Sequence, residues 1–181
     1  MASLRPARTC RDVDKPAWTR WSKKKPRKSY VKARPHTNLY HMDMGVDRDD
    51  YDVVVKLVSK VPIQLRDGAL ESARLAVHKY MQRVAKDNYK FKILPYPHII
   101  LREHRMLTGA GADRLSSGMK KAFGRPTDRA ARLKKGQTLF VVRTYSKNVN
   151  HVLEAYRRAR CKLSGRYGVE IQQITSEEKN A

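Results

Sequence analysis

Residues 51–84 read YDVVVKLVSKVPIQLRDGALESARLAVHKYMQRV, and this stretch carries the clearest structural signals in the sequence. Its first half is rich in β-branched residues, which predicts a strand that ends in a turn at Pro62. Its second half predicts a helix that Asp67 can cap, because apolar residues recur there at helical spacing. The residues expected to face inward from this helix are Leu70, Ala73, Val77, Tyr80, Met81 and Val84.

Shorter patterns on the C-terminal side complete the set of expected elements. Strand signals cover residues 90–94, 98–102, 137–144 and 168–174, and residues 151–160 form a second amphipathic helix. The residues expected to face inward near this helix are Val149, Val152, Leu153, Tyr156 and Leu163. Two helices interleaved with short strands predict an α+β fold, a two-layer sandwich with both helices on one face of a largely antiparallel sheet.

The chain is strongly basic, with forty Lys and Arg residues against seventeen Asp and Glu residues and a net charge of +23. Residues 1–37 contain twelve basic and two acidic residues, residues 102–136 contain ten and three, and residues 156–166 contain five and none. Charge added for solubility would be spread along the chain. Its concentration in three segments instead predicts surfaces that meet a polyanion.

The first of these segments, residues 1–37, shows neither helical nor strand periodicity and contains four prolines. Proline disfavours regular helix and like charges repel, so this segment is expected to be an extended basic arm that orders on its partner. Trp18, Trp21 and Tyr30 lie among the cations. Their rings are equally suited to stacking on unpaired bases and to packing on the protein's own core.

The second segment contains GAGADRLSSGMKKAFGRP, residues 109–126, which has four glycines among cations. The spacing G-x-G-x-x-R lacks the third glycine of a dinucleotide fingerprint, and no P-loop pattern is present. Large apolar residues such as Met119 and Phe123 recur between the glycines, so the segment is expected to pack and not to act as a flexible tether. An irregular cationic loop that reaches into folded RNA is the remaining interpretation.

Other classes of function have weaker support. Cys10 and Cys161 lack a C-x-x-C partner and are expected to be free thiols, so no metal site and no cofactor is predicted. No apolar run is long enough for a membrane span, and the N-terminal residues MASLRPARTCRDVDK lack the apolar region of a signal peptide, which predicts a cytosolic protein that contacts no membrane.

Two alternatives to RNA binding in a larger assembly stay open. The carboxylates of Asp47, Asp49, Asp50 and Asp52 would suit a metal-dependent nuclease if the fold gathered them with a third ligand. A free-standing RNA chaperone is the other alternative. The favoured interpretation has no catalytic residue and no small-molecule substrate.

Four segments together resemble one known family. They are HRMLTGAGADRLSSGMKKAFGRPTDRAARLKKGQTLFVV at 104–142, RPAR at 5–8, ALESARLAVHKYM at 69–81 and HVLEAYRRARCKLSGR at 151–166. The chain resembles, nearly end to end, the universal large-subunit ribosomal protein family numbered sixteen in bacteria and ten-e in archaea and eukaryotes. The segment DKPAWTRWSKKKPRKSYV at 14–31 looks archaeal.

The resemblance implies an α/β-hammerhead type of fold and a place in the cytoplasmic ribosome. The implied partners are large-subunit rRNA, the tRNA of the aminoacyl site and neighbouring large-subunit proteins. A loop at about residues 102–118 would extend toward the peptidyl-transferase region. Its tRNA-proximal residues would be Arg102, His104, Arg105, Met106, Gly109, Gly111 and Arg114.

The expected organisation is therefore a basic arm at 1–37, one rRNA-binding domain at 38–175 and a short tail at 176–181. The cations predicted to contact rRNA come from all three basic segments. They are Arg5, Arg8, Arg20, Lys23, Lys24, Lys25, Arg27, Lys28, Arg34, Lys120, Lys121, Arg125, Arg157, Arg158 and Arg160.

Overall fold

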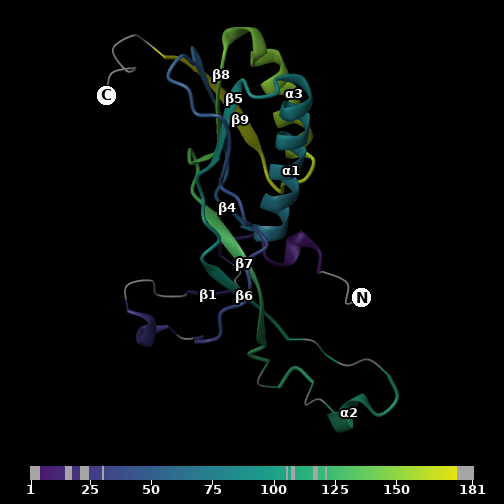
Figure 1. Cartoon of the computed structure of the whole chain (residues 1–181). Helices are drawn as coiled ribbons and strands as arrows, with labels where there is room; N and C mark the ends of the chain where they lie inside the picture. Colours follow the sequence, from purple (N-terminus) through teal and green to yellow (C-terminus); the bar gives the residue numbers. More distant parts are fainter. Residues whose placement is uncertain are drawn as a thin grey trace.

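In the computed structural model, two antiparallel sheets and two long helices form the body of the described chain (Figure 1). The structure describes residues 5–14, 18–20, 25–29, 31–104, 106, 109–115, 118–120 and 122–174. The five-stranded sheet contains, in spatial order, β2 (Asp43–Gly45), β5 (Tyr89–Ile93), β8 (Thr138–Thr144), β3 (Val53–Ser59) and β9 (Tyr167–Gln173). The four-stranded sheet contains β1 (Trp18–Arg20), β6 (Ile99–Glu103), β7 (Arg125–Leu133) and β4 (Ile63–Arg66).

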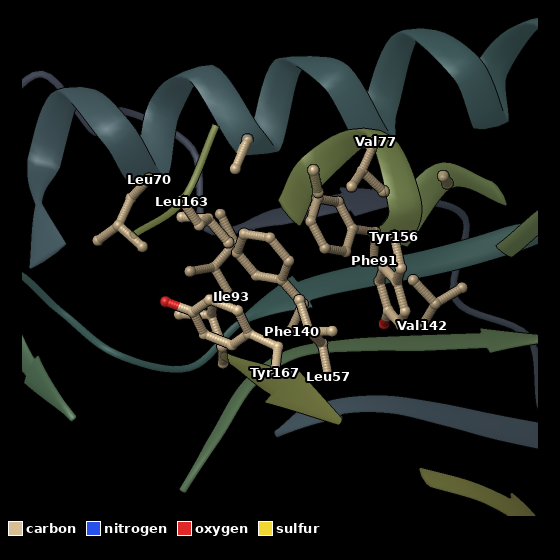
Figure 2. Packing of buried hydrophobic residues seen from close by; sticks show 14 of the residues in the cluster. Leu57, Leu70, Val77, Phe91, Ile93, Phe140, Val142, Tyr156, Leu163 and Tyr167 are labelled. Carbon is tan, nitrogen blue, oxygen red and sulfur yellow. The ribbon is translucent and has the colours of Figure 1, made fainter. Parts of the chain in front are cut away.

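The helices α1 (Asp67–Val84) and α3 (Val149–Arg160) pack side by side on one face of the five-stranded sheet (Figure 1). Their apolar faces meet the inner side chains of the strands in the main core (Figure 2). Phe91 and Phe140 contact edge to face with ring centroids 5.2 Å apart. The buried Tyr156 donates its hydroxyl hydrogen to the Val55 carbonyl oxygen at 2.8 Å. This arrangement confirms the predicted α+β sandwich with antiparallel pairing.

Asp67, which the sequence predicts as the cap of the first helix, lies at the start of α1. Its side chain is buried, and Oδ1 accepts from the Gly68 amide at 2.8 Å. Oδ2 accepts from the Asn38 amide at 2.9 Å, so the same carboxylate also anchors the chain that enters the domain. Asp67 is the first helical residue and not the cap itself, since Arg66 holds that position.

Two residues predicted to face inward are more than a third exposed, and for these the prediction was wrong. Val84 ends α1 and is 38% exposed, and Leu153 is 37% exposed. The buried stripe of α3 runs through Val152, Ala155 and Tyr156, which turns Leu153 to the margin of that stripe.

The second sheet was not expected from the sequence, and β7 is its longest strand. Residues 130–133 of β7 pair with β4, and residues 125–130 pair with β6. A register shift opposite Leu101 and Arg102 leaves Thr127 without a strand partner, which forms a bulge next to Pro126. Proline is tolerated here because the bulge does not need its missing N–H.

The first described residues pack on this four-stranded sheet. The Gln64 amide donates to the Arg11 carbonyl at 2.8 Å, and the Gln64 side chain donates to the Cys10 carbonyl at 2.8 Å. Cys10 is buried with Ile99 and Leu101 in a small second core. Residues 5–14 therefore lie against the body, whereas the sequence led us to expect that they order only on a partner. Cys10 and Cys161 are both free thiols.

Candidate nucleic-acid interface

The connection between β6 and β7, residues 104–124, projects beyond both sheets and carries the short helix α2 (Ala112–Leu115) (Figure 1). We call this connection the projecting loop. Gly109, Gly111 and Gly118 have φ values of 151°, 77° and 61° with open space around them. Such backbone favours glycine, and the missing side chains leave the main chain accessible to a ligand.

Three cations from the predicted sites, the tRNA-proximal Arg114 and the rRNA-contacting Lys120 and Arg125, are exposed on or beside this loop. Arg114 lies in α2, Lys120 lies in the returning half of the loop, and Arg125 is the first residue of β7. Met106 is 46% exposed and Met119 is 66% exposed. The apolar residues of the loop were expected to pack, but these two side chains meet solvent instead.

The base of the projecting loop is held by contacts between its outgoing and returning halves. Arg102 Nη1 donates to the Phe123 carbonyl oxygen, and the Arg102 guanidinium lies 4.0 Å from the centroid of the Phe123 ring. His104 Nε2 donates to the Gly118 carbonyl oxygen at 2.8 Å. Gly124 has a φ of 79°, and a Cβ atom there would lie 2.9 Å from the carbonyl carbon of Glu103. These contacts fix the direction in which the loop leaves the sheet.

A cavity of about 620 Å³ opens at this base, between the projecting loop and the first described residues. Arg5 Nε donates to Glu103 Oε1 at 2.8 Å across the two segments. Arg66 Nη1 donates to the Arg5 carbonyl oxygen at 2.6 Å, and Arg66 Nε donates to Cys10 Sγ at 3.0 Å. The other residues of the lining are Thr9, Leu101, Arg102, His104, Met106, Met119, Ala122, Phe123, Thr127 and Asp128.

The arginines of α3 share one carboxylate. Glu154 accepts from Arg157 Nε at 2.7 Å and from Arg158 Nε at 3.0 Å. Hydrogen bonds from Arg157 and then Arg158 lower the pKa of Glu154 to about 2. The Arg158 guanidinium also lies 4.2 Å from the Tyr80 ring centroid. This face therefore presents less net charge than the arginine count alone indicates, and Arg160 stays exposed beside it.

The N-terminal cations differ in how far the structure describes them. Arg5 and Arg8 are exposed, and so are Lys25, Arg27 and Lys28. Arg34 is exposed and donates to the Tyr96 hydroxyl at 3.5 Å. Arg20 lies in β1, where only the backbone is described. Some of the residues singled out from the sequence lie outside the described part. They are Lys23, Lys24, Arg105 and Lys121, together with Trp21, Tyr30 and the predicted tail at 176–181.

Sequence reasoning missed the cations that the fold uses internally. Arg129 is buried, and its Nε donates to the Pro35 carbonyl oxygen at 2.7 Å while Nη1 donates to the Tyr96 hydroxyl at 3.2 Å. Arg132 Nη2 donates to the Val13 carbonyl oxygen at 3.3 Å. No local sequence signal marks these two side chains, because β7 lacks the run of β-branched residues that is typical of a strand.

The carboxylates considered for a nuclease do not converge. Asp47 pairs with Lys90 at 3.5 Å, and Asp52 accepts from the Ser146 hydroxyl at 3.4 Å. Across the described residues, His, Cys, Asp and Glu side chains form no group of three that would hold a metal ion. None of the helices in the described part of the chain has the length and apolar character that a membrane span requires.

Comparisons with known proteins match this chain to a family of ribosomal proteins. The family model of ribosomal protein L16p/L10e matches residues 18–170. The large ribosomal subunit protein uL16 of Methanococcus aeolicus is 43% identical over 162 residues, which cover 89% of this chain and 90% of that protein. The uL16 protein of Haloarcula marismortui is 36% identical over 175 residues, which cover 94% of this chain and 95% of that protein. Archaeoglobus fulgidus has a uL16 protein that is 43% identical over 152 residues, 82% of this chain and 87% of that protein.

Proposed function

The chain belongs to the L16p/L10e family of ribosomal proteins, and we propose that it binds large-subunit rRNA near the aminoacyl-tRNA site and helps to position tRNA there. At the coarser level it is a structural constituent of the large ribosomal subunit, of archaeal type, and not an enzyme. The ribosome in the cytoplasm is accordingly its location, and neighbouring large-subunit proteins are among its partners.

The observation that carries the proposal is a cationic projecting loop whose base is clamped. The contacts from Arg102 to Phe123 and from His104 to Gly118 hold its two halves together. A clamped base lets the loop hold a fixed direction, so Arg114 near its tip meets a ligand at a defined place. A loop with such a direction suits the positioning of a tRNA relative to the catalytic RNA.

Contacts to rRNA belong, in this proposal, to the exposed cations away from the loop tip. Exposed cations of the N-terminal segment would make these contacts, and Arg160 of α3 would add to them. The N-terminal cations are Arg8, Lys25, Arg27 and Lys28. Lys and Arg side chains that neutralise phosphates release bound counterions, which gives affinity without sequence preference. In this scheme residues 1–37 act as the basic arm, of which 5–14 already pack on the body, while 38–175 act as the rRNA-binding domain and 102–118 as the segment that approaches tRNA.

Rebinding to salt-stripped large subunits tests the rRNA part of the proposal. We expect the purified chain to rejoin stripped subunits and to leave them again at high salt. If about eight cations meet phosphates, the logarithm of affinity falls with the logarithm of salt concentration at a slope of about −6 to −7. Equal binding to any polyanion, without preference for the stripped subunit, would instead identify a free-standing RNA chaperone.

The tRNA part needs a separate measurement on subunits that contain the protein. We expect Arg114→Ala to leave rejoining intact and to weaken tRNA binding at the aminoacyl site. Lys28→Ala is the matched control, because it removes one exposed cation far from the loop in sequence. Equal weakening of tRNA binding by both variants would contradict a specific role for the loop.

A further inference from the structure

We propose that the cavity at the base of the projecting loop receives one unpaired RNA nucleotide, whose base stacks against Phe123 and whose phosphate meets the surrounding arginines. This inference rests on the proposed function, since it takes the chain to be bound to ribosomal RNA. It adds a site and a ligand class to that function. The site lies at the loop base and not at the tip.

The cavity has the size that a nucleotide requires. Its volume of about 620 Å³ falls within the roughly 300 to 1,000 Å³ of pockets that hold small organic ligands. It is bounded by strand residues of the four-stranded sheet on one side and by both halves of the projecting loop on the other. The contact between Arg5 and Glu103 joins the N-terminal segment to this wall, so the cavity exists only when both segments are in place.

The loop side of the cavity is apolar and exposed. Met106, Met119 and Phe123 all line it, and 46%, 66% and 48% of their surfaces are accessible. Three large apolar side chains that meet solvent around one cavity indicate a binding surface. An aromatic ring with polarisable thioethers beside it presents the flat, apolar contact on which bases stack.

The cationic side of the cavity is already in position. Arg66 is held by the Arg5 carbonyl oxygen and by Cys10 Sγ, and Arg102 is held against the ring of Phe123. Arg102 Nε is buried and has no hydrogen-bond partner among the described residues. Arg5 completes a set of three guanidinium groups around the opening. Guanidinium groups held in this way match phosphate oxygens with little loss of side-chain freedom.

The polar groups favour a nucleotide over a peptide. A guanidinium stacked on an aromatic ring is a surface typical of the recognition of unpaired bases. The carboxylates of Glu103 and Asp128 also line the cavity and accept hydrogen bonds from donors such as the amino groups of a base. An apolar peptide anchor would use the methionines and Phe123 but would bring no anion to the guanidinium groups of Arg66 and Arg102, which line the same cavity.

The test is ultraviolet crosslinking of reconstituted large subunits, followed by mass spectrometry of peptide–nucleotide adducts. We expect the unaltered chain to form an adduct on the peptide that contains Met119 and Phe123. Phe123→Leu keeps the apolar bulk but removes the ring. It should lower the adduct yield by about fivefold or more, measured per molecule of protein bound to the subunits. Phe123→Trp should preserve the yield. Tyr40→Leu is the control, since it removes an aromatic ring that is 66% exposed outside the cavity.

The outcomes distinguish a failure of the nucleotide site from a failure of the proposed function. An adduct on vacant subunits identifies the nucleotide as rRNA, and an adduct only after tRNA is added identifies it as tRNA; both support the site. Normal rejoining of subunits without an adduct at this peptide contradicts the site alone. A crosslink from Phe123 to a neighbouring protein contradicts it as well and makes the cavity a protein-docking site. Failure of the unaltered chain to rejoin contradicts the proposed function itself.

Discussion

Gly124 and Gly136 share a φ of 79° but differ in what surrounds them, and the pair tests whether the loop base is sterically fixed. An alanine at either position is forced into left-handed backbone, which costs about 1–2 kcal/mol. Reduced freedom of the unfolded chain offsets about 0.4–1 kcal/mol of that cost. At Gly136 nothing lies within 4 Å of the added Cβ, so Gly136→Ala should lower the free energy of unfolding by about 1 kcal/mol.

Gly124→Ala carries an additional cost. Its Cβ atom would lie 2.9 Å from the Glu103 carbonyl carbon and 3.0 Å from the His104 nitrogen, and both of these are backbone atoms. Backbone cannot rotate away as a side chain does, so we expect a further cost of about 1–3 kcal/mol, typical of overpacked sites. The cost should appear mainly where β6 and β7 pair at Glu103 and Arg125.

Urea unfolding with amide hydrogen exchange measures both effects. Gly124→Ala should lower the free energy of exchange at the loop end of β6 and β7 by about 1–3 kcal/mol more than Gly136→Ala does. In reconstituted subunits it should also weaken tRNA binding at the aminoacyl site, while Gly136→Ala should not. Exchange energies that agree within about 0.5 kcal/mol between the two variants would refute the reasoning that backbone contact fixes the loop base.

The remaining predictions concern the loop tip, the core and one histidine. Arg114→Ala should leave the free energy of unfolding within about 0.5 kcal/mol of the original, because the side chain is exposed, yet it should reduce translation by reconstituted ribosomes. Unfolding of that variant under native conditions would count against a contact role. Leu70→Ala should cost about 2–5 kcal/mol in urea unfolding because Leu70 is fully buried, whereas Leu153→Ala should cost clearly less. Burial, with Arg74 nearby, lowers the pKa of His78, so the free energy of unfolding should fall as pH drops below about 6.5. His78→Gln should flatten that dependence.

The parts of the fold that the sequence predicts well are those with one buried face. The α1 helix places Leu70, Ala73 and Val77 on one side, and burial of that side determines which residues can occupy it. The strands β3 and β8 are rich in β-branched residues for the same reason. Antiparallel pairing and the two-layer arrangement then follow from the order of elements.

The strand β7 could not be predicted from local sequence. Its residues RPTDRAARL include a proline, an aspartate and two alanines, which are depleted in strands. Arg129 is accepted inside because the Pro35 carbonyl oxygen and the Tyr96 hydroxyl take its donors. Those partners lie 94 and 33 positions away in the chain, so no short window of sequence contains the reason for the burial.

The candidate site was predictable in composition but not in geometry. Charge clustering identified the projecting loop and the arginines of α3 as cationic. The spacing of Glu154 to Arg157 and Arg158 is typical of ion pairs within a helix, and it accounts for the charge that this face loses. The cavity depends on Arg5 meeting Glu103 across 98 positions, which only the folded chain reveals.

The strand β7 runs without interruption from the loop base to the main core, so its length sets how far the projecting loop extends from that core. Its nine residues span about 30 Å at the usual rise of a strand, and Leu133 at its far end is anchored in the main core. Removing two residues would shorten the reach of the loop by about 7 Å and keep every side chain on its own face. Removing one residue from the regular part of the strand would turn side chains to the opposite face, so there the length can change only in even steps, whereas the bulge at Thr127 is the place where a single residue can be lost.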